Sequence, residues 1–122
     1  MGAAGRKGSM VATQTIPERG DLAWLSFDPQ TGHEQAGRRP AVVLSPSLYN
    51  GVVGLAMVCP VTQQVKGYRF EVALPEGLPV SGVVLADQAR SVDWRARRAV
   101  VIGQLPARVT EEVLQKVRTL LS

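Results

Sequence analysis

The sequence predicts a mainly β fold, in which short antiparallel strands form a small barrel or a curled sheet and the chain ends in one α-helix. Two observations carry this prediction. Six short apolar runs are separated by irregular turns, and a helical spacing of apolar residues appears only near the C-terminus. A length of 122 residues with 45% hydrophobic residues suits a single domain that buries a core.

The first three predicted strands cover residues 21–27 (DLAWLSF), 40–45 (PAVVLS) and 54–61 (GLAMVCPV). The first strand ends at the turn pair Asp28-Pro29, and the polar loop of residues 28–38 that follows is too long for a tight hairpin turn. The second is a continuous apolar run, which is typical of a strand buried on both faces. In the third, Pro60 has no backbone N–H, which restricts it to a sheet edge or to the end of its strand.

The other three predicted strands cover residues 68–74, 83–86 and 99–103. The first of them alternates regularly, and four residues share the face that we expect to be buried: Tyr68, Phe70, Val72 and Leu74. Residues 87–98 form a polar cluster with four arginines and two aspartates. We interpret Arg95, Arg97 and Arg98 as part of a solvated turn, and we keep Gln88 as a candidate functional residue because it directly follows a buried run.

The C-terminal helix is predicted to begin at Thr110, whose hydroxyl suits the N-cap, while Glu111 and Glu112 favour the positive end of the helix dipole. Val109 and Leu114 have the spacing of a hydrophobic staple across that start. Five apolar residues share one face of the helix: Val113, Leu114, Val117, Leu120 and Leu121.

Composition limits the compartment and the partners. Residues 1–9 (MGAAGRKGS) have no apolar stretch and end in Gly-Ser before Met10, so we interpret them as a leader added for expression and assign one domain to residues 10–122. The net charge is +4, but Arg6 and Lys7 lie in the leader, so the domain is too weakly basic to coat nucleic acid by charge alone. One cysteine and no apolar stretch of about 20 residues indicate a soluble cytoplasmic protein without a membrane span.

Polar groups gather where the long loop meets the second strand. The stretch EQAGRRP, residues 34–40, places a carboxylate, an amide and two guanidinium groups just before a buried strand. Pro40 pushes the preceding residue toward an extended conformation, so we expect the Arg39 side chain to project from a defined position. The alternative is a surface pair of Arg39 with Glu34, which contributes about 0–1 kcal/mol.

A second polar group follows the third strand. Thr62, Gln63, Gln64 and Lys66 place a hydroxyl, two amides and an ammonium group at a strand end, with Tyr68 just beyond. Amides can read the edges of bases, and an aromatic ring can stack on an unpaired base. The alternative is an ordinary polar turn with Tyr68 in the core, which its place on the apolar face of its strand favours.

Several kinds of chemistry are excluded by counting. The single histidine, His33, cannot form a two-histidine acid–base pair, and Cys59 has no Cys-His context. No carboxylates, histidines or cysteines have the ligand spacing of a catalytic metal site, and no Gly-rich loop opens a helix to hold a nucleotide phosphate. We therefore predict chemistry that needs no metal and no cofactor.

Four segments closely resemble the MazF/PemK toxin family: GDLAWLSFDP (20–29), GHEQAGRRPAVVLSP (32–46), PVTQQVKGYRFEV (60–72) and VVLADQARSVDWRAR (83–97). The resemblance runs from residue 17 to the C-terminus. It implies an SH3-like barrel that forms a homodimer and cleaves single-stranded RNA, such as mRNA, within a short recognition sequence. It also implies a MazE-like antitoxin whose acidic, disordered tail occupies the RNA groove. The resemblance assigns catalytic roles to Arg39 and Thr62 and matches Glu34 to the glutamate of the EQxGxRP element.

We expect cleavage by attack of the ribose 2′-hydroxyl on the adjacent phosphorus, which leaves a 2′,3′-cyclic phosphate and a 5′-hydroxyl. Arg39 and Thr62 then stabilise the developing negative charge, while Glu34 orients Arg39 and is a candidate to accept the proton. Arg38 stands where some relatives carry a histidine, which leaves the general base open.

The residues expected to contact RNA are Phe27, Gln35, Asn50, Gln63, Gln64, Lys66 and Gln88. Two other functions remain open, because the fold alone does not separate them from cleavage: a CcdB-like toxin that binds gyrase, and a barrel that binds RNA without cutting it. Only cleavage requires the set of Glu34, Arg39 and Thr62.

Overall fold

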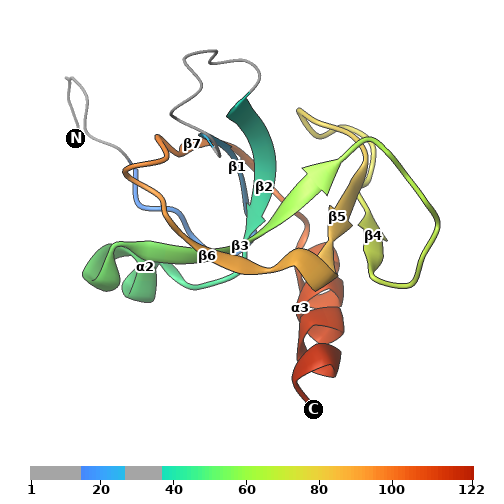
Figure 1. Cartoon of the computed structure of the whole chain (residues 1–122). Helices are drawn as coiled ribbons and strands as arrows, with labels where there is room; N and C mark the ends of the chain where they lie inside the picture. Colours follow the sequence, from blue (N-terminus) through green and yellow to red (C-terminus); the bar gives the residue numbers. More distant parts are fainter. Residues whose placement is uncertain (1–14, 27–36) are drawn as a thin grey trace.

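The computed structural model describes residues 15–26 and 37–122 of the chain (Figure 1). In chain order its elements are β1 (Asp21–Ser26), β2 (Arg38–Val43), α2 (Ser47–Val53), β3 (Leu55–Thr62), β4 (Glu71–Ala73), β5 (Val83–Leu85), the 3-10 turn η2 (Ala86–Gln88), β6 (Arg90–Asp93), β7 (Val100–Gln104) and α3 (Ala107–Leu121). The predicted mainly β fold with a C-terminal helix is confirmed.

The seven strands of the described region form an antiparallel sheet in the order β4-β5-β3-β2-β1-β7, and β6 pairs with β3 beside that path. The path runs from β4 to β7 without closing, so the strands make an open, barrel-like fold. Helix α3 contacts η2 and β4, whereas α2 lies on the opposite side of the molecule from β4 (Figure 1).

The sheet buries an apolar cluster on each face. Successive residues of a strand point to opposite faces, so Val42 joins the cluster that includes Val113 of α3, whereas Val43 joins a second cluster with Trp94. Strand β2 is therefore covered on both sides, as its continuous apolar run predicts.

Pro60 lies inside β3, two residues before the strand ends at Thr62, so both predicted positions, a sheet edge and the end of its strand, are wrong. Strand β3 pairs with β2 along one side, and along the other it pairs with β6 as far as Val58 and with β5 from Val61 onward. Pro60 lies in the gap between these two partners. The missing N–H therefore interrupts no pairing on that side of β3.

The sequence does not predict α2 or β6. Pro46 at the N-cap of α2 offers no side-chain hydrogen bond, and the exposed backbone N–H of Ser47 instead donates to Glu18 Oε1 at 2.8 Å. In β6 only Val92 is buried, and the polar residues around it leave no apolar pattern that would predict a strand. The solvated turn predicted just beyond β6 is present at residues 94–98.

Helix α3 begins at Ala107, after Pro106 at its N-cap, so the prediction that Thr110 caps the helix is wrong. Thr110 lies inside the helix, its side chain is buried, and its hydroxyl has no hydrogen-bond partner within the described residues. Val109 is also helical, so the predicted staple with Leu114 is wrong as well. The helix begins earlier than predicted because proline, which has no N–H to leave unsatisfied, readily precedes a helix.

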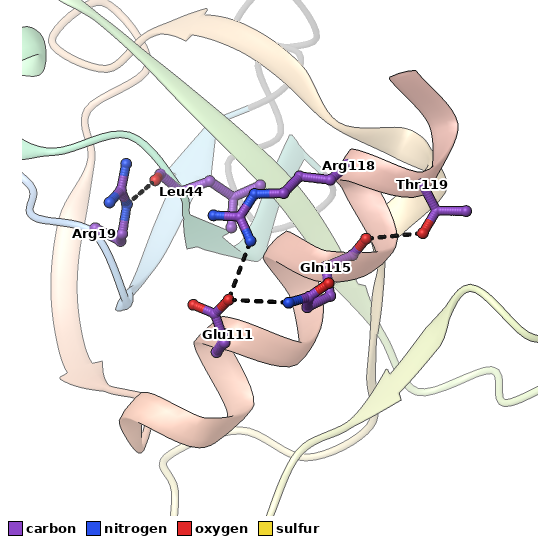
Figure 2. A network of polar contacts seen from close by, with 6 residues as sticks. All are labelled: Arg19, Leu44, Glu111, Gln115, Arg118 and Thr119. Carbon is purple, nitrogen blue, oxygen red and sulfur yellow. Dashed lines mark hydrogen bonds and ion pairs between the residues drawn. The ribbon is translucent and has the colours of Figure 1, made fainter. Parts of the chain in front are cut away.

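The apolar face predicted for α3 is confirmed only in the first part of the helix. Val113, Leu114 and Val117 pack on the core, whereas Leu120 and Leu121 are exposed. On the outer face of the helix, the carboxylate of Glu111 accepts hydrogen bonds from Arg118 and Gln115 (Figure 2).

Candidate functional site

A groove of about 490 Å³ opens where the ends of β2, β3 and β5 meet. It is lined by Arg39, Pro60, Val61, Thr62, Leu85, Gln88, Ala89 and Arg90. Strands β2 and β3 pair as far as Ala41 opposite Pro60. Two residues beyond this pair, Arg39 of β2 and Thr62 of β3 both line the groove. Because residues two apart on a strand share a face, Arg39 lies on the same face of β2 as Ala41, and Thr62 lies on the same face of β3 as Pro60.

The two neighbouring arginines of β2 have different surroundings. Arg38 turns toward β1, where its Nη1 donates to Ser26 Oγ at 3.1 Å. Arg39 is exposed along the groove, and no residue in the described part of the chain accepts a hydrogen bond from it. Arg39 is therefore the guanidinium of this pair that is available to a ligand.

Thr62 is half-buried at the end of β3. Its Oγ1 accepts a hydrogen bond from the backbone N–H of Gln64 at 3.1 Å, which leaves the hydroxyl proton to donate elsewhere. Gly82 packs directly against the backbone of Thr62, since a Cβ at position 82 would lie 2.1 Å from the Thr62 carbonyl oxygen. With φ at +123°, only glycine fits this approach without strain.

A second compartment of about 220 Å³ continues the groove, because Thr62, Leu85 and Gln88 line both spaces. The smaller compartment is completed by Gln64, Lys66, Tyr68 and Glu71. We call the two spaces the arginine compartment and the tyrosine compartment.

Two carboxylates hold the wall of the tyrosine compartment. Glu71 accepts hydrogen bonds from the backbone N–H groups of Lys66 and Gly67 at 2.8 and 2.9 Å. The hydroxyl of Tyr68 donates to Asp87 Oδ1 at 2.9 Å, and this hydrogen bond is the main reason that the pKa of Tyr68 is raised above 10. Tyr68 therefore stays a neutral hydrogen-bond donor through the neutral pH range.

The structure brings five of the predicted site residues together: Arg39, Thr62, Gln64, Lys66 and Gln88. Phe27, Glu34 and Gln35 lie outside the described residues. Gln63 lines neither compartment, and its Nε2 donates to Ser81 Oγ at 3.2 Å.

The prediction that Asn50 reads bases is wrong, because Asn50 is fully buried in α2. Its amide nitrogen donates to the carbonyl oxygens of Pro17 and Ser45, and its Oδ1 accepts from the Ser45 hydroxyl at 2.6 Å. Its backbone carbonyl also accepts from Trp94 Nε1. Asn50 therefore ties α2 to the rest of the domain.

Sequence reasoning misses several residues of the groove, among them Leu85, Ala89, Arg90 and Glu71. Leu85 could have been found from alternation, since it neighbours the buried Val84 and must face the other way. No local signal identifies Glu71, because its role depends on two amides of a loop.

The remaining reactive groups lie outside the groove. The Cys59 thiol is buried, which raises its pKa to about 12 and keeps it unreactive near neutral pH. Residues 15–26 and 37–122 contain no group of three or more histidine, cysteine, aspartate or glutamate side chains arranged to hold a metal ion. Over the same residues, no helix has the length and apolar character needed to cross a membrane.

Three kinds of comparison with known proteins agree. A family model described as the PemK-like, MazF-like toxin of type II toxin-antitoxin systems matches residues 18–121. The chain is 45% identical over 111 residues to the endoribonuclease toxin MazF of Escherichia coli (strain K12), covering 91% of this chain and 99% of that protein. It is 36% identical over 117 residues to the endoribonuclease PemK of Escherichia coli, covering 93% and 88% of the two chains.

Solved structures give the same result. The crystal structure of MazF (Form-I) from Deinococcus radiodurans matches with a TM-score of 0.80 at 59% identity, covering 88% of this chain and 98% of that one. A MazE-MazF structure (Form-II) from the same organism matches with a TM-score of 0.79 at 54% identity, covering 88% and 97%.

Proposed function

The chain belongs to the family of PemK-like, MazF-like toxins of type II toxin–antitoxin systems, and we propose that it is an endoribonuclease that cleaves single-stranded RNA, including mRNA, within a short recognition sequence. The observation that carries the proposal is that Arg39 and Thr62, which come from neighbouring strands, line the same groove. A toxin that only binds gyrase has no need of such a pair, and the curated relatives are themselves named endoribonucleases.

The proposed reaction needs no metal, because RNA supplies its own nucleophile. The ribose 2′-oxygen attacks the adjacent phosphorus as its proton passes to a base, and the bond from phosphorus to the 5′-oxygen breaks. The leaving oxygen takes a proton and becomes a 5′-hydroxyl, while the other product ends in a 2′,3′-cyclic phosphate. DNA lacks the 2′-hydroxyl and is spared.

Arg39 and Thr62 supply the charge stabilisation. The phosphorus passes through a pentacoordinate state with more negative charge on its oxygens than the starting phosphodiester has. Donors fixed before the reaction bind that state more strongly than the substrate, and Arg39 offers a fork of charged N–H groups while Thr62 offers a hydroxyl.

The proton acceptor is a separate question. A guanidinium group stays protonated in proteins and is therefore a poor general base near neutral pH. We propose that Glu34, five residues before Arg39 in the sequence, orients Arg39 and accepts the proton of the 2′-hydroxyl.

We assign recognition of the RNA sequence to the side-chain amides and the ammonium group around the groove. Gln64, Lys66 and Gln88 line it and can reach the edges of unstacked bases. Gln63 lies next to this wall, and we retain it with Phe27 and Gln35 as proposed RNA contacts.

The proposal also covers the cellular compartment, the oligomeric state and the inhibitor. We propose a cytoplasmic homodimer inhibited by a MazE-like antitoxin whose acidic, disordered tail enters the groove. In support, the similar Deinococcus radiodurans structure contains MazE with MazF, and the groove carries two arginines that suit an acidic peptide as well as RNA.

The test is to incubate the purified protein with a long RNA in the presence of a chelator and to map the cut sites and their chemical ends. We expect cuts at a short shared sequence that leave 2′,3′-cyclic phosphate and 5′-hydroxyl ends. A matched RNA with one 2′-deoxy nucleotide at a mapped site should resist cleavage there. Intact RNA would overturn the function, and cleavage that stops with chelator and leaves a 3′-hydroxyl would overturn the metal-free reaction.

A further inference from the structure

The two compartments of the groove differ in chemistry. The arginine compartment carries Arg39 and Arg90, and none of the described residues that line it is acidic. The tyrosine compartment carries the carboxylate of Glu71 with the single ammonium group of Lys66. A phosphate is therefore drawn more strongly toward the arginine compartment, because in the other compartment the charge of Lys66 is offset by that of Glu71.

The lining of the tyrosine compartment instead suits a nucleobase. Tyr68 and Leu85 offer an aromatic and an apolar surface to the flat face of a base, while the amides of Gln64 and Gln88 offer donors and acceptors to its edge. Thr62 lies on the boundary of the two compartments. A base in one compartment would thus belong to a nucleotide next to the phosphate in the other.

Tyr68 is fixed in place before any ligand arrives. Its hydroxyl donates to Asp87 Oδ1 at 2.9 Å, which ties the ring to η2. Its backbone lies just after Lys66 and Gly67, whose N–H groups are both held by Glu71. The side-chain bond and the anchored backbone just before the residue limit the freedom that the ring has to lose on binding, which favours stacking.

We propose that the tyrosine compartment is a base-binding subsite in which Tyr68 stacks on the base of a nucleotide adjacent to the cleaved phosphodiester, and that Tyr68 thereby helps to determine which sequence is cut. The inference rests on the proposed RNA cleavage. Tyr68 acts through substrate binding, whereas Arg39 and Thr62 act on the reacting phosphate.

The test compares Tyr68→Leu, which removes the aromatic ring but keeps an apolar side chain, with Tyr68→Phe, which keeps the ring and removes the bond to Asp87. Tyr49→Leu is the matched control, because Tyr49 is the other tyrosine of the chain and lies on α2, away from the groove (Figure 1). Each protein is assayed for cut sites on a long RNA and for kcat and KM on an oligonucleotide with a mapped site. Binding is measured with the same oligonucleotide blocked by a 2′-deoxy nucleotide.

We expect Tyr68→Leu to raise KM and the Kd of the blocked oligonucleotide about 5- to 100-fold, the range seen for loss of one base-stacking contact. Its kcat should change by less than about threefold, and its cut sites should lose discrimination at one position beside the cleaved bond. Tyr68→Phe and Tyr49→Leu should both keep the wild-type cut sites and a KM within about threefold of the wild-type value.

A Tyr68→Leu protein with wild-type cut sites and wild-type Kd would overturn the subsite while leaving the proposed function intact. A fall in kcat alone, with unchanged Kd, would also overturn it, because Tyr68 would then act on the reaction rather than on binding. If Tyr68→Leu does not fold, the wild-type protein still decides with blocked oligonucleotides that carry an abasic nucleotide on one or the other side of the cleaved bond. An unchanged Kd for both abasic oligonucleotides would overturn the subsite. A wild-type protein that leaves RNA intact overturns the proposed function and the subsite together.

Discussion

The groove and the outer face of α3 both present arginines at the surface, but their surroundings differ. Beside α3, Arg118 donates to Glu111 at 3.1 Å, and the Nε of Arg19 donates to the carbonyl oxygen of Leu44 at 2.6 Å (Figure 2). In the groove, Arg39 has no partner in the described part of the chain and lines the same cavity as Thr62. Identical side chains thus have different surroundings. Near α3 the described residues accept hydrogen bonds from the arginines, whereas none of the described residues accepts one from Arg39.

The most direct test of this difference is to remove one arginine from each region. Arg39→Ala should lower kcat for RNA cleavage about 100- to 1,000-fold, as the loss of one preorganised donor does. Arg118→Ala should leave kcat within about twofold and change the free energy of unfolding by less than about 1 kcal/mol, because its pair with Glu111 is exposed. Both variants are checked by thermal unfolding. Equal rates for the two variants would remove the distinction between the regions.

A second prediction concerns the backbone that holds the groove. Gly82→Ala places a Cβ against the Thr62 carbonyl oxygen and should lower the free energy of unfolding by about 2–4 kcal/mol, with loss of cleavage. Gly77→Ala is the control, since Gly77 also has a positive φ but no atom within 4 Å of a Cβ, and should cost about 1 kcal/mol. Denaturant titration measures both values. Similar costs would mean that Thr62 is not held by this approach.

A third prediction concerns Thr110 of α3. Its buried hydroxyl has no hydrogen-bond partner in the described residues, unlike the arginines near the same helix. Thr110→Val keeps the shape, removes the hydroxyl and should raise the free energy of unfolding by about 1 kcal/mol. Thr119→Val loses an exposed hydroxyl that donates to the Gln115 carbonyl oxygen and should change stability by less than about 0.5 kcal/mol. A destabilised Thr110→Val protein would show that the hydroxyl is satisfied.

The smallest effect is expected from Glu18, another group that the protein uses internally. Its hydrogen bonds, first that from the backbone N–H of Ser47, lower its pKa below 4.5. A lowered carboxylate pKa contributes stability that is present above pH 4.5 and is lost as the pH falls through the folded-state pKa. The Tm difference between wild type and Glu18→Gln should therefore be steady from pH 7 to 5 and shrink toward pH 3. A difference that grows on acidification would contradict this assignment.

The sequence predicts the strands of this fold wherever the apolar pattern is strong. Strand β2 is found from its continuous apolar run, and the buried face of β4 from regular alternation around Val72. Strand β6 is missed because only Val92 is buried, so its pairing with β3 and not its composition makes it a strand. Helix α2 is missed because its cap comes from Glu18, which is distant in sequence.

The site is predictable to the same degree. Arg39 and Thr62 stand out because polar residues gather just before one buried strand and just after another, and the pairing of β2 with β3 brings both to one groove. The tyrosine compartment is predictable only in part. Gln64, Lys66 and Gln88 are found from the sequence, but the compartment wall depends on the contacts of Tyr68 with Asp87 and of Glu71 with loop amides. Asn50 is misassigned because the pair Asn50-Gly51 is typical of an exposed turn, and only the packing of α2 reveals that its amide is buried.

The change of strand partners along β3 at Pro60 divides the sheet into two parts that differ in how easily they open locally. Before Pro60, β3 lies between β2 and β6, whereas after it the groove wall depends on β5 and β4, strands of only three residues each. Short strands open locally at lower free energy than long ones. The amides of β4 and β5 should therefore exchange with deuterium sooner than those shared by β1 and β2. Bound RNA should slow that exchange by closing the wall around itself.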